Sequence, residues 1–263
     1  MKKECYTAEF KEVYDYCINN SLYLGEGNPN ARILIIGKEC AIAGSNPEEK
    51  EKKVLEENLK KWESILENPF CIDSIKSELK KQDIENYTND YYPLFPHLGQ
   101  KYLQRRKHKD GSYIGDKGTA ATWYFYQKLV DKIMGNPEKG KEDYIDFHLN
   151  CFHSELSQIP SPMSNSSPKE LVKNSIKKRS ELFRKAFFQQ FPVIILAAAH
   201  YPRDYSFNIQ EIFDVKCEKQ ENWINIHSQK TGTRRILLHT RQLSMISNDY
   251  INNIAELCKP FYK

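Results

Sequence analysis

A carboxylate, an amide and two imidazoles lie at the ends of four short runs of residues that predict β-strands. Glu39 follows the first run, Asn150 ends the second, His200 follows the third and His239 ends the fourth. Ligands of open α/β sheets bind where parallel strands end at their carboxyl side, so we expect these side chains to meet at one edge of the sheet. Carboxylates and imidazoles are common general acids and bases, so the set favours hydrolytic chemistry.

Each of these residues also has a simpler explanation. A lone histidine at a strand end, such as His200 or His239, is more often a hydrogen-bonded structural residue than a catalyst. Asn150 could cap a turn. The prediction of a site therefore depends on their common placement and not on any one side chain.

The four runs are the elements that would position these side chains. Ile33–Ile36 is unbroken, apolar and mostly β-branched, which is typical of a strand buried on both faces. The other three runs are Tyr144–Asn150, Pro192–Ala199 and Arg235–His239. Helical patterns alternate with them, which predicts parallel strands joined by right-handed crossovers. We therefore expect an α/β fold, a three-layer α/β/α sandwich with a central four-stranded parallel sheet.

One domain is expected to span residues 1–263, with a helical and loop insertion at about 46–118. Asn46 and Pro47 indicate a helix start inside the insertion, because a capping side chain precedes proline at the first helical position. Lys101–Lys109 is a basic cluster that could follow a phosphate backbone or form a solvated surface loop, and both interpretations stay open. Trp223–His227 and the turn Lys230–Thr233 predict a hairpin before the fourth strand.

Composition excludes several classes of protein. A hydrophobic fraction of 40% with 12% aromatic residues is enough for a core, so wholesale disorder is not expected. The net charge of +4 is compatible with a polyanion partner without requiring one. Seven cysteines without a Cys-x-x-Cys pair indicate a reduced compartment rather than a disulfide framework or a zinc ribbon. Without an apolar signal core or a run of about 18 apolar residues, a cytoplasmic protein with no membrane association is expected.

Three stretches resemble the uracil-DNA glycosylase superfamily. Gly25–Ala31, before the strand Ile33–Gly37, is similar to the approach to that superfamily's first strand. Phe147–Asn150 corresponds to a strand that ends in a base-recognising asparagine. His239–Ser244 resembles the signature His-Pro-Ser-Pro-Leu-Ser, with the His, the Leu and the last Ser in place. The resemblance covers most of the chain and implies a divergent member with a uracil-DNA glycosylase-like fold.

The resemblance also implies catalytic roles. Glu39 would position or activate the attacking water, and Asn150 would recognise the extruded base through its amide. His239 would stabilise the negative charge of the leaving base, and one such donor is worth roughly 2.7–4 kcal/mol.

Residues of the same late stretch would contact DNA. By the resemblance, Leu243 would fill the space that the extruded base leaves in the duplex. Arg241 and Ser244 would bind phosphates.

Several positions depart from the superfamily pattern. Cys40 and Ala41 replace the proline and the aromatic or glycine residue that usually follow the carboxylate. The aromatic residue would exclude the methyl group of thymine, so its loss leaves the choice of base open. Lys38 lies where other branches carry their acid, and Thr240–Gln242 replaces Pro-Ser-Pro, which makes this loop more polar and less rigid.

Three functional hypotheses follow. The first is a DNA glycosylase-like hydrolase that removes a damaged base, with uracil as the expected one, from single- or double-stranded DNA. The second is a nucleic-acid or nucleotide binder of the same fold without that activity, and the third is an unrelated α/β enzyme that uses Glu39 and His239. We expect a monomer with no cofactor or metal. Superfamily members with an iron–sulfur cluster need four suitably placed cysteines, and Cys5 and Cys17 are too far apart for the usual close pair, so no cluster is expected.

Overall fold

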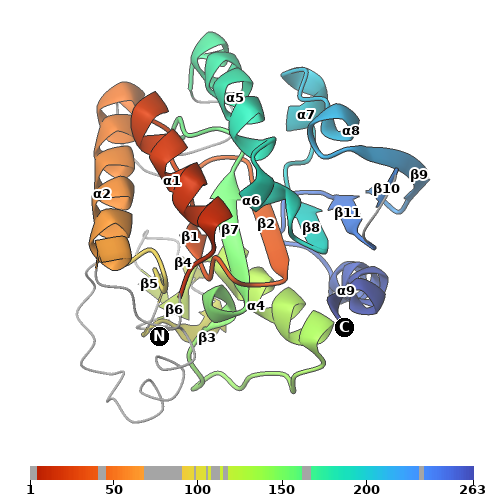
Figure 1. Cartoon of the computed structure of the whole chain (residues 1–263). Helices are drawn as coiled ribbons and strands as arrows, with labels where there is room; N and C mark the ends of the chain where they lie inside the picture. Colours follow the sequence, from red (N-terminus) through yellow and green to blue (C-terminus); the bar gives the residue numbers. More distant parts are fainter. Residues whose placement is uncertain are drawn as a thin grey trace.

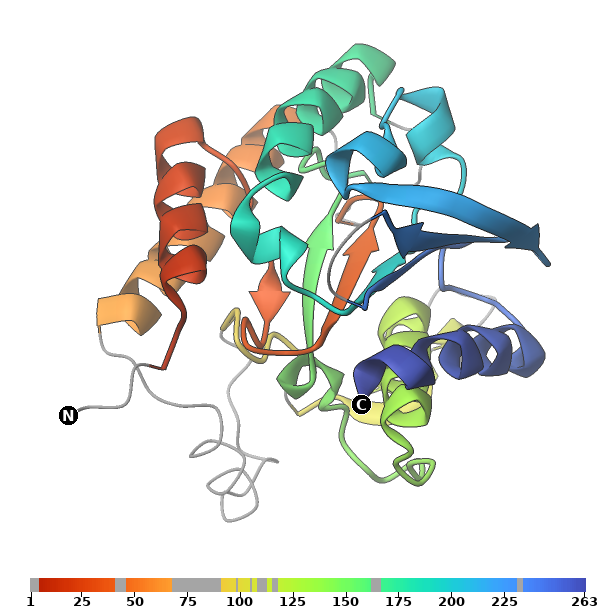
Figure 2. The same ribbon diagram turned by 45° about the vertical axis from the view of Figure 1, so that its right-hand side comes forward.

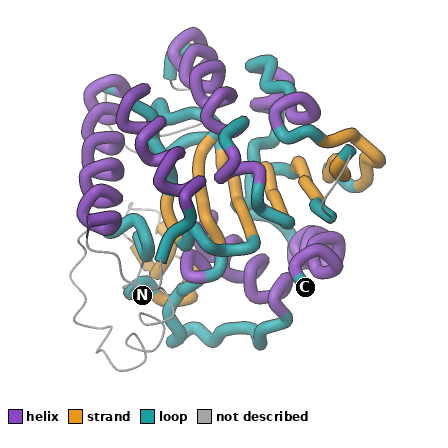
Figure 3. Tube along the Cα trace, viewed as in Figure 1, coloured by secondary structure: helices purple, strands orange, loops and turns teal. Residues whose placement is uncertain are grey.

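The computed structural model describes residues 5–40, 46–67, 91–97, 99–104, 106–107, 113–114, 118–161, 167–230 and 234–263. Its centre is a seven-stranded sheet in the order β1-β7-β2-β8-β11-β10-β9 (labelled in Figure 1; strands are orange in Figure 3). The strands in that order are Glu26–Gly27, Cys151–Glu155, Ile33–Gly37, Val193–Leu196, Ile236–His239, Ile224–Gln229 and Val215–Glu221. Two small two-stranded sheets, β3 (Lys101–Gln104) with β6 (Gly118–Thr119) and β4 (Arg106–Lys107) with β5 (Tyr113–Ile114), accompany it.

The prediction of a central four-stranded parallel sheet is wrong. Strands β7, β2, β8 and β11 run parallel, but they are part of a larger mixed sheet. Three of its strand pairs are antiparallel, namely β1–β7, β10–β11 and β9–β10. Neither β1 nor β9 was predicted, because β1 has only two residues and the exposed, charged residues of β9 carry no apolar pattern.

The prediction that Tyr144–Asn150 forms the second strand is also wrong. Phe147–Leu149 forms a short 3₁₀ helix, η2, and β7 begins only at Cys151. All five residues of β7 are buried, although three of them, His153, Ser154 and Glu155, are polar. The apolar pattern therefore predicted the wrong segment as the strand. The polar side chains of β7 are stabilised in the interior by contacts with distant parts of the chain, which a local pattern does not reveal.

Helices cover both faces of the sheet (Figure 1). One face packs against α1 (Ala8–Asn20), α2 (Pro47–Glu67), α5 (Lys169–Phe183) and α6 (Ala186–Gln189), with the short helices α7 (Tyr201–Asp204) and α8 (Ile209–Ile212) beside them. The other face packs against α4 (Ala121–Met134) and α9 (Asn248–Tyr262), which lie side by side (Figures 1 and 2).

The first helix of the insertion is confirmed. It is α2, and the Asn46 side chain accepts a hydrogen bond from the backbone N–H of Glu49 at 3.3 Å, as expected of a cap. Much of the remaining insertion, 68–90 and most of the basic cluster after Gln104, lies outside the described residues, as does the turn after Lys230. Within the described part of the chain, no helix is both long and apolar enough to cross a lipid bilayer.

Candidate functional site

A cavity of about 400 Å³ lies at the carboxyl ends of β2 and β7. The end of β2 and the loop after it contribute Gly37–Cys40, and β7 contributes His153 and Glu155. The first turns of α4, which begins directly after β6, contribute Thr122, Trp123 and Tyr126 to the lining. The cavity thus lies at the sheet edge where α/β proteins bind ligands.

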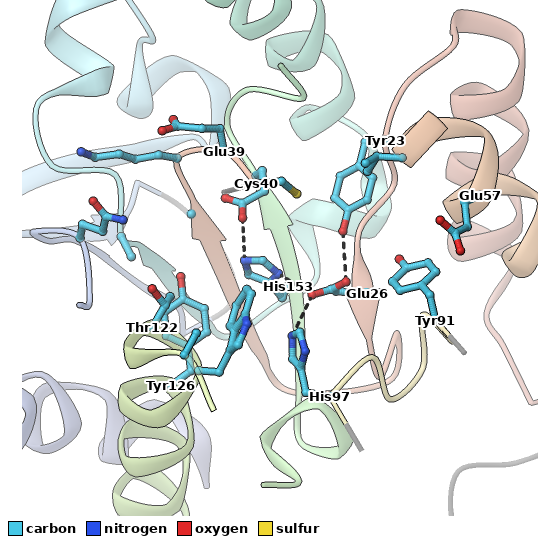
Figure 4. Close-up of a pocket in the computed structure, with 18 residues that line it drawn as sticks. Tyr23, Glu26, Glu39, Cys40, Glu57, Tyr91, His97, Thr122, Tyr126 and His153 are labelled. Carbon is cyan, nitrogen blue, oxygen red and sulfur yellow. Dashed lines mark hydrogen bonds and ion pairs between the residues drawn. The ribbon is translucent and has the colours of Figure 1, made fainter. Parts of the chain in front are cut away.

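Two glutamates and two histidines form a buried network beside this cavity. Glu26 accepts a hydrogen bond from His153 Nδ1 at 3.3 Å and from the Tyr23 hydroxyl at 3.3 Å, and His97 Nε2 lies 3.5 Å from its carboxylate. His153 Nε2 lies 3.4 Å from Oε1 of Glu155. Figure 4 shows Tyr23, His97 and His153 converging on Glu26. His153 therefore lies between two carboxylates.

Strand pairing creates this network. The antiparallel pairing of β1 with β7 sets Glu26 directly opposite His153. His153 and Glu155 are two residues apart in one strand, so their side chains leave the same face of the sheet. Phe152 and Leu156 lie in the core on the other face.

The network strongly perturbs the protonation of its members. Burial opposes the charging of His153, but Glu155 and Glu26 outweigh burial and raise the pKa of His153 to about 9. Burial alone would raise the pKa of Glu26, but hydrogen bonds from His153 and His97 hold that pKa well below its usual range. At neutral pH the site therefore contains a charged imidazolium at His153, paired with the ionised carboxylate of Glu26.

Aromatic rings also line the cavity. Trp123 stacks on His97 with centroids 4.3 Å apart, and it makes an edge contact with Tyr126 at 5.5 Å. Tyr23 and Tyr91 also line the cavity. Aromatic rings in a concave site offer flat surfaces against which a ring ligand can pack.

A buried arginine supports the floor of the site from behind. Arg179 is fully buried, and its guanidinium donates hydrogen bonds to the backbone carbonyls of Glu155 and Tyr23 and to the hydroxyl of Ser154. Three donors from one rigid fork connect the end of β7 to the segment before β1, so Arg179 fixes the position of Glu155.

No family model, curated protein or solved structure matches this chain.

Of the predicted site residues, Glu39 lines the cavity, and it is partly buried there (Figure 4). Asn150 does not line the cavity, because it lies between η2 and β7, at the amino end of β7, whereas the cavity lies at the carboxyl end of this strand. His200 lies after β8, outside the cavity lining, and its Nε2 is 3.7 Å from Asp204.

His239 is held by hydrogen bonds within the fold. Its Nε2 donates to the carbonyl of Ala199 at 2.6 Å, and its Nδ1 accepts from the amide of Asn225 at 3.1 Å. Gln242, three residues later, lines the cavity instead. The structure therefore brings Glu39 to the site but not Asn150 or His239.

The predicted DNA contacts are divided between core and surface. Leu243 is fully buried in the core formed by α4 and α9, so its side chain is not available to enter a duplex. Ser244 is partly buried, and Arg241 is exposed with its guanidinium 4.7 Å above the ring of Trp223. Met245, which is 88% exposed, is the apolar side chain of this loop that faces solvent.

Sequence reasoning missed Glu26, His153 and Glu155. A signal for the last two was present, since a short segment before a helical region carries a histidine and a glutamate two residues apart. Such a spacing puts both groups on one face of a strand, but only the pairing with β1 adds Glu26.

Two other chemistries find no support in the described part of the chain. Burial and the neighbouring carboxylates raise the pKa of the Cys40 thiol well above its ordinary value, which opposes the thiolate that a cysteine nucleophile requires. Among the described residues, no group of three or more His, Cys, Asp or Glu side chains has the geometry of a metal site.

Proposed function

We propose that this protein hydrolyses the N-glycosidic bond between a nucleobase and its sugar in DNA. The observation that carries the proposal is the meeting of several carboxylates and aromatic rings in one cavity. Glu26, Glu39, Glu57 and Glu155 all line it, together with Trp123 and other aromatic side chains.

The charge of the cavity suits this reaction. Cleavage of a glycosidic bond passes through a transition state in which the sugar resembles a positively charged oxocarbenium ion. Carboxylates that surround the sugar stabilise that charge as it develops, and the interaction is strong where water is excluded. Transfer of a phosphoryl group would instead need cations around the reacting phosphate. Among the described residues that line the cavity, the cationic groups are Lys38 and the imidazolium of His153, and His153 is held between Glu26 and Glu155.

The shape of the cavity supports a flat ring as ligand. A volume of about 400 Å³ falls within the range of small-molecule sites, roughly 300–1,000 Å³. Trp123, Tyr126, Tyr23 and Tyr91 line the cavity, and stacking of a base on an aromatic ring is worth about 1–3 kcal/mol. A base extruded from DNA could therefore enter between these rings and the carboxylates.

Glu39 is the group that we propose activates water. It is partly buried at the mouth of the cavity, in the loop directly after β2. A general base in this position contributes typically about 10²–10⁴-fold to the rate. Arg241 and Trp223 are exposed beside the loop that contributes Gln242, where they could contact the sugar–phosphate backbone.

One observation favours a second candidate, a nucleic-acid or nucleotide binder without hydrolysis. Both nitrogens of His239 are engaged inside the fold, so this imidazole is not positioned to stabilise a leaving base. The Gln242 amide lines the cavity from the same loop and is a weaker substitute, because it carries no charge.

Matched oligonucleotides with one damaged base each, single- and double-stranded, test the proposal. After incubation with the protein, alkali cleaves any abasic site, and strand breaks report base release. Breaks that disappear with Glu39→Gln, but persist with the exposed control Glu56→Gln, support hydrolysis. Salt-sensitive binding without breaks on any substrate supports the binder, and neither binding nor breaks contradicts both.

A further inference from the structure

Glu155 is the polar group at the end of β7, the strand next to β2, and it lies on the floor of the cavity. Its side chain is 6% exposed. Oε1 lies 3.4 Å from the charged imidazolium of His153, whereas Oε2 has no hydrogen-bond partner among the described residues. A buried polar atom without a partner costs free energy, so a ligand that supplies a donor here would gain affinity.

The donor pattern of Glu155 differs from that of an amide. An asparagine side chain presents one acceptor and one pair of donors, which matches the edge of uracil, where a carbonyl lies beside an N–H group. An ionised carboxylate presents acceptors only. It therefore favours a ring edge with two neighbouring donors and repels the carbonyl oxygens of uracil.

Among the common bases, guanine has this edge, because its N1–H lies next to its 2-amino group. Hypoxanthine has the same ring system without the 2-amino group, and uracil has a single N–H between two carbonyls. These three bases therefore form a graded test of what the carboxylate selects.

We propose that Glu155 recognises the N1–H and 2-amino edge of a guanine-type base, so that the substrate is a damaged guanine that retains both donors. The proposal rests on the proposed function for the hydrolytic step, but the recognition can be measured without it. Gly37 makes room for this carboxylate, since a Cβ built there would be 2.1 Å from Oε2 of Glu155. The absence of a side chain at Gly37 leaves the space that this oxygen occupies.

Binding of soluble nucleosides to the full chain tests the recognition. Titration calorimetry would compare deoxyguanosine, deoxyinosine and deoxyuridine. Bidentate pairs with a base discriminate by about 1–3 kcal/mol, so deoxyguanosine should bind roughly 10- to 100-fold more tightly than deoxyinosine. Glu155→Gln should remove most of this preference, whereas Glu56→Gln, an exposed glutamate on α2 outside the cavity, should keep it.

The outcomes separate the two proposals. Equal binding of deoxyguanosine and deoxyinosine, tighter binding of deoxyuridine, or no nucleoside binding at all would each overturn the recognition. The comparison on the unaltered protein decides the question even where Glu155→Gln fails to fold. A guanine preference without base release from oligonucleotides leaves the recognition standing and refutes hydrolysis. Release of uracil in preference to damaged guanine would support hydrolysis and overturn the recognition of guanine by Glu155.

Discussion

The carboxylate of Glu155 lies against the α-carbon of Gly37, with Oε2 only 2.1 Å from the place that a Cβ would occupy. The two residues are paired across the parallel strands β2 and β7. A glycine at the end of β2 is thus required by its neighbour in the sheet, because any larger residue would displace the carboxylate from the floor of the cavity.

Gly37→Ala should move this carboxylate with only a limited loss of stability. Glu155 can rotate away, so we expect a fall of about 1–3 kcal/mol in the free energy of unfolding, as for other overpacked sites. The loss in the free energy of nucleoside binding should be much larger than the loss in the free energy of unfolding, because the displaced carboxylate would also move its Oε1 away from His153. Urea unfolding and calorimetry measure the two effects. Gly140→Ala, where the new Cβ would be 3.4 Å from Asp143, is the control, and equal binding losses in both variants would contradict the argument.

Glu39→Gln should reduce base release by about 10²–10⁴-fold while DNA affinity changes little, because the amide keeps the shape of the side chain and loses the basic carboxylate. Single-turnover rates and salt titrations of binding measure the two quantities. Loss of affinity in parallel with the rate would show that Glu39 holds the structure of the loop and does not activate water.

Leu243→Ala should destabilise the fold by about 2–5 kcal/mol, because it leaves a cavity in the core. Met245→Ala should change the free energy of unfolding by less than about 0.5 kcal/mol, since this side chain faces solvent. Thermal and urea unfolding compare the two variants. A stable Leu243→Ala protein that binds DNA poorly would instead restore Leu243 as a residue that enters the duplex.

Stability should fall as the pH rises from about 6.5 to 9. Burial disfavours charge on His153, but Glu155 and Glu26 raise its pKa to about 9, above that of the unfolded chain. The stabilisation is therefore complete at a pH below the pKa of His153 in the unfolded chain. It is lost as the pH rises through the pKa of His153 in the folded protein, and the free energy of unfolding falls by about 3 kcal/mol at most. Urea unfolding across this range measures the slope. His153→Gln should flatten it, and an unchanged slope would show that another group titrates.

Acid should destabilise the protein through two other histidines. Burial lowers the pKa of His148 to about 3 and that of His227 to about 4. Both histidines are neutral in the folded protein. Their contribution to the free energy of unfolding is therefore present at a pH above about 6.5, the pKa of histidine in the unfolded chain, and is lost as the pH falls below that value. His227→Phe, which removes one titrating group, should make the loss of stability between about pH 6.5 and 4 shallower in the same unfolding experiment. A loss as steep as in the unaltered protein would exclude His227 as its source.

The sequence by itself determined the elements whose signals are local. An apolar β-branched run predicted β2, and a cap followed by proline predicted α2, because backbone geometry and short-range hydrogen bonds decide both within a few residues. The position of Glu39 after β2 followed from the same reasoning.

Only the tertiary structure decided which polar groups meet. Glu26 and His153 are 127 positions apart, and the register of β1 on β7 joins them. The same long-range packing buries Leu243, occupies both nitrogens of His239 and leaves Asn150 at the far edge of the sheet. Residue type and spacing do not encode such contacts locally, since they depend on strand register and on the burial of distant surfaces against one another.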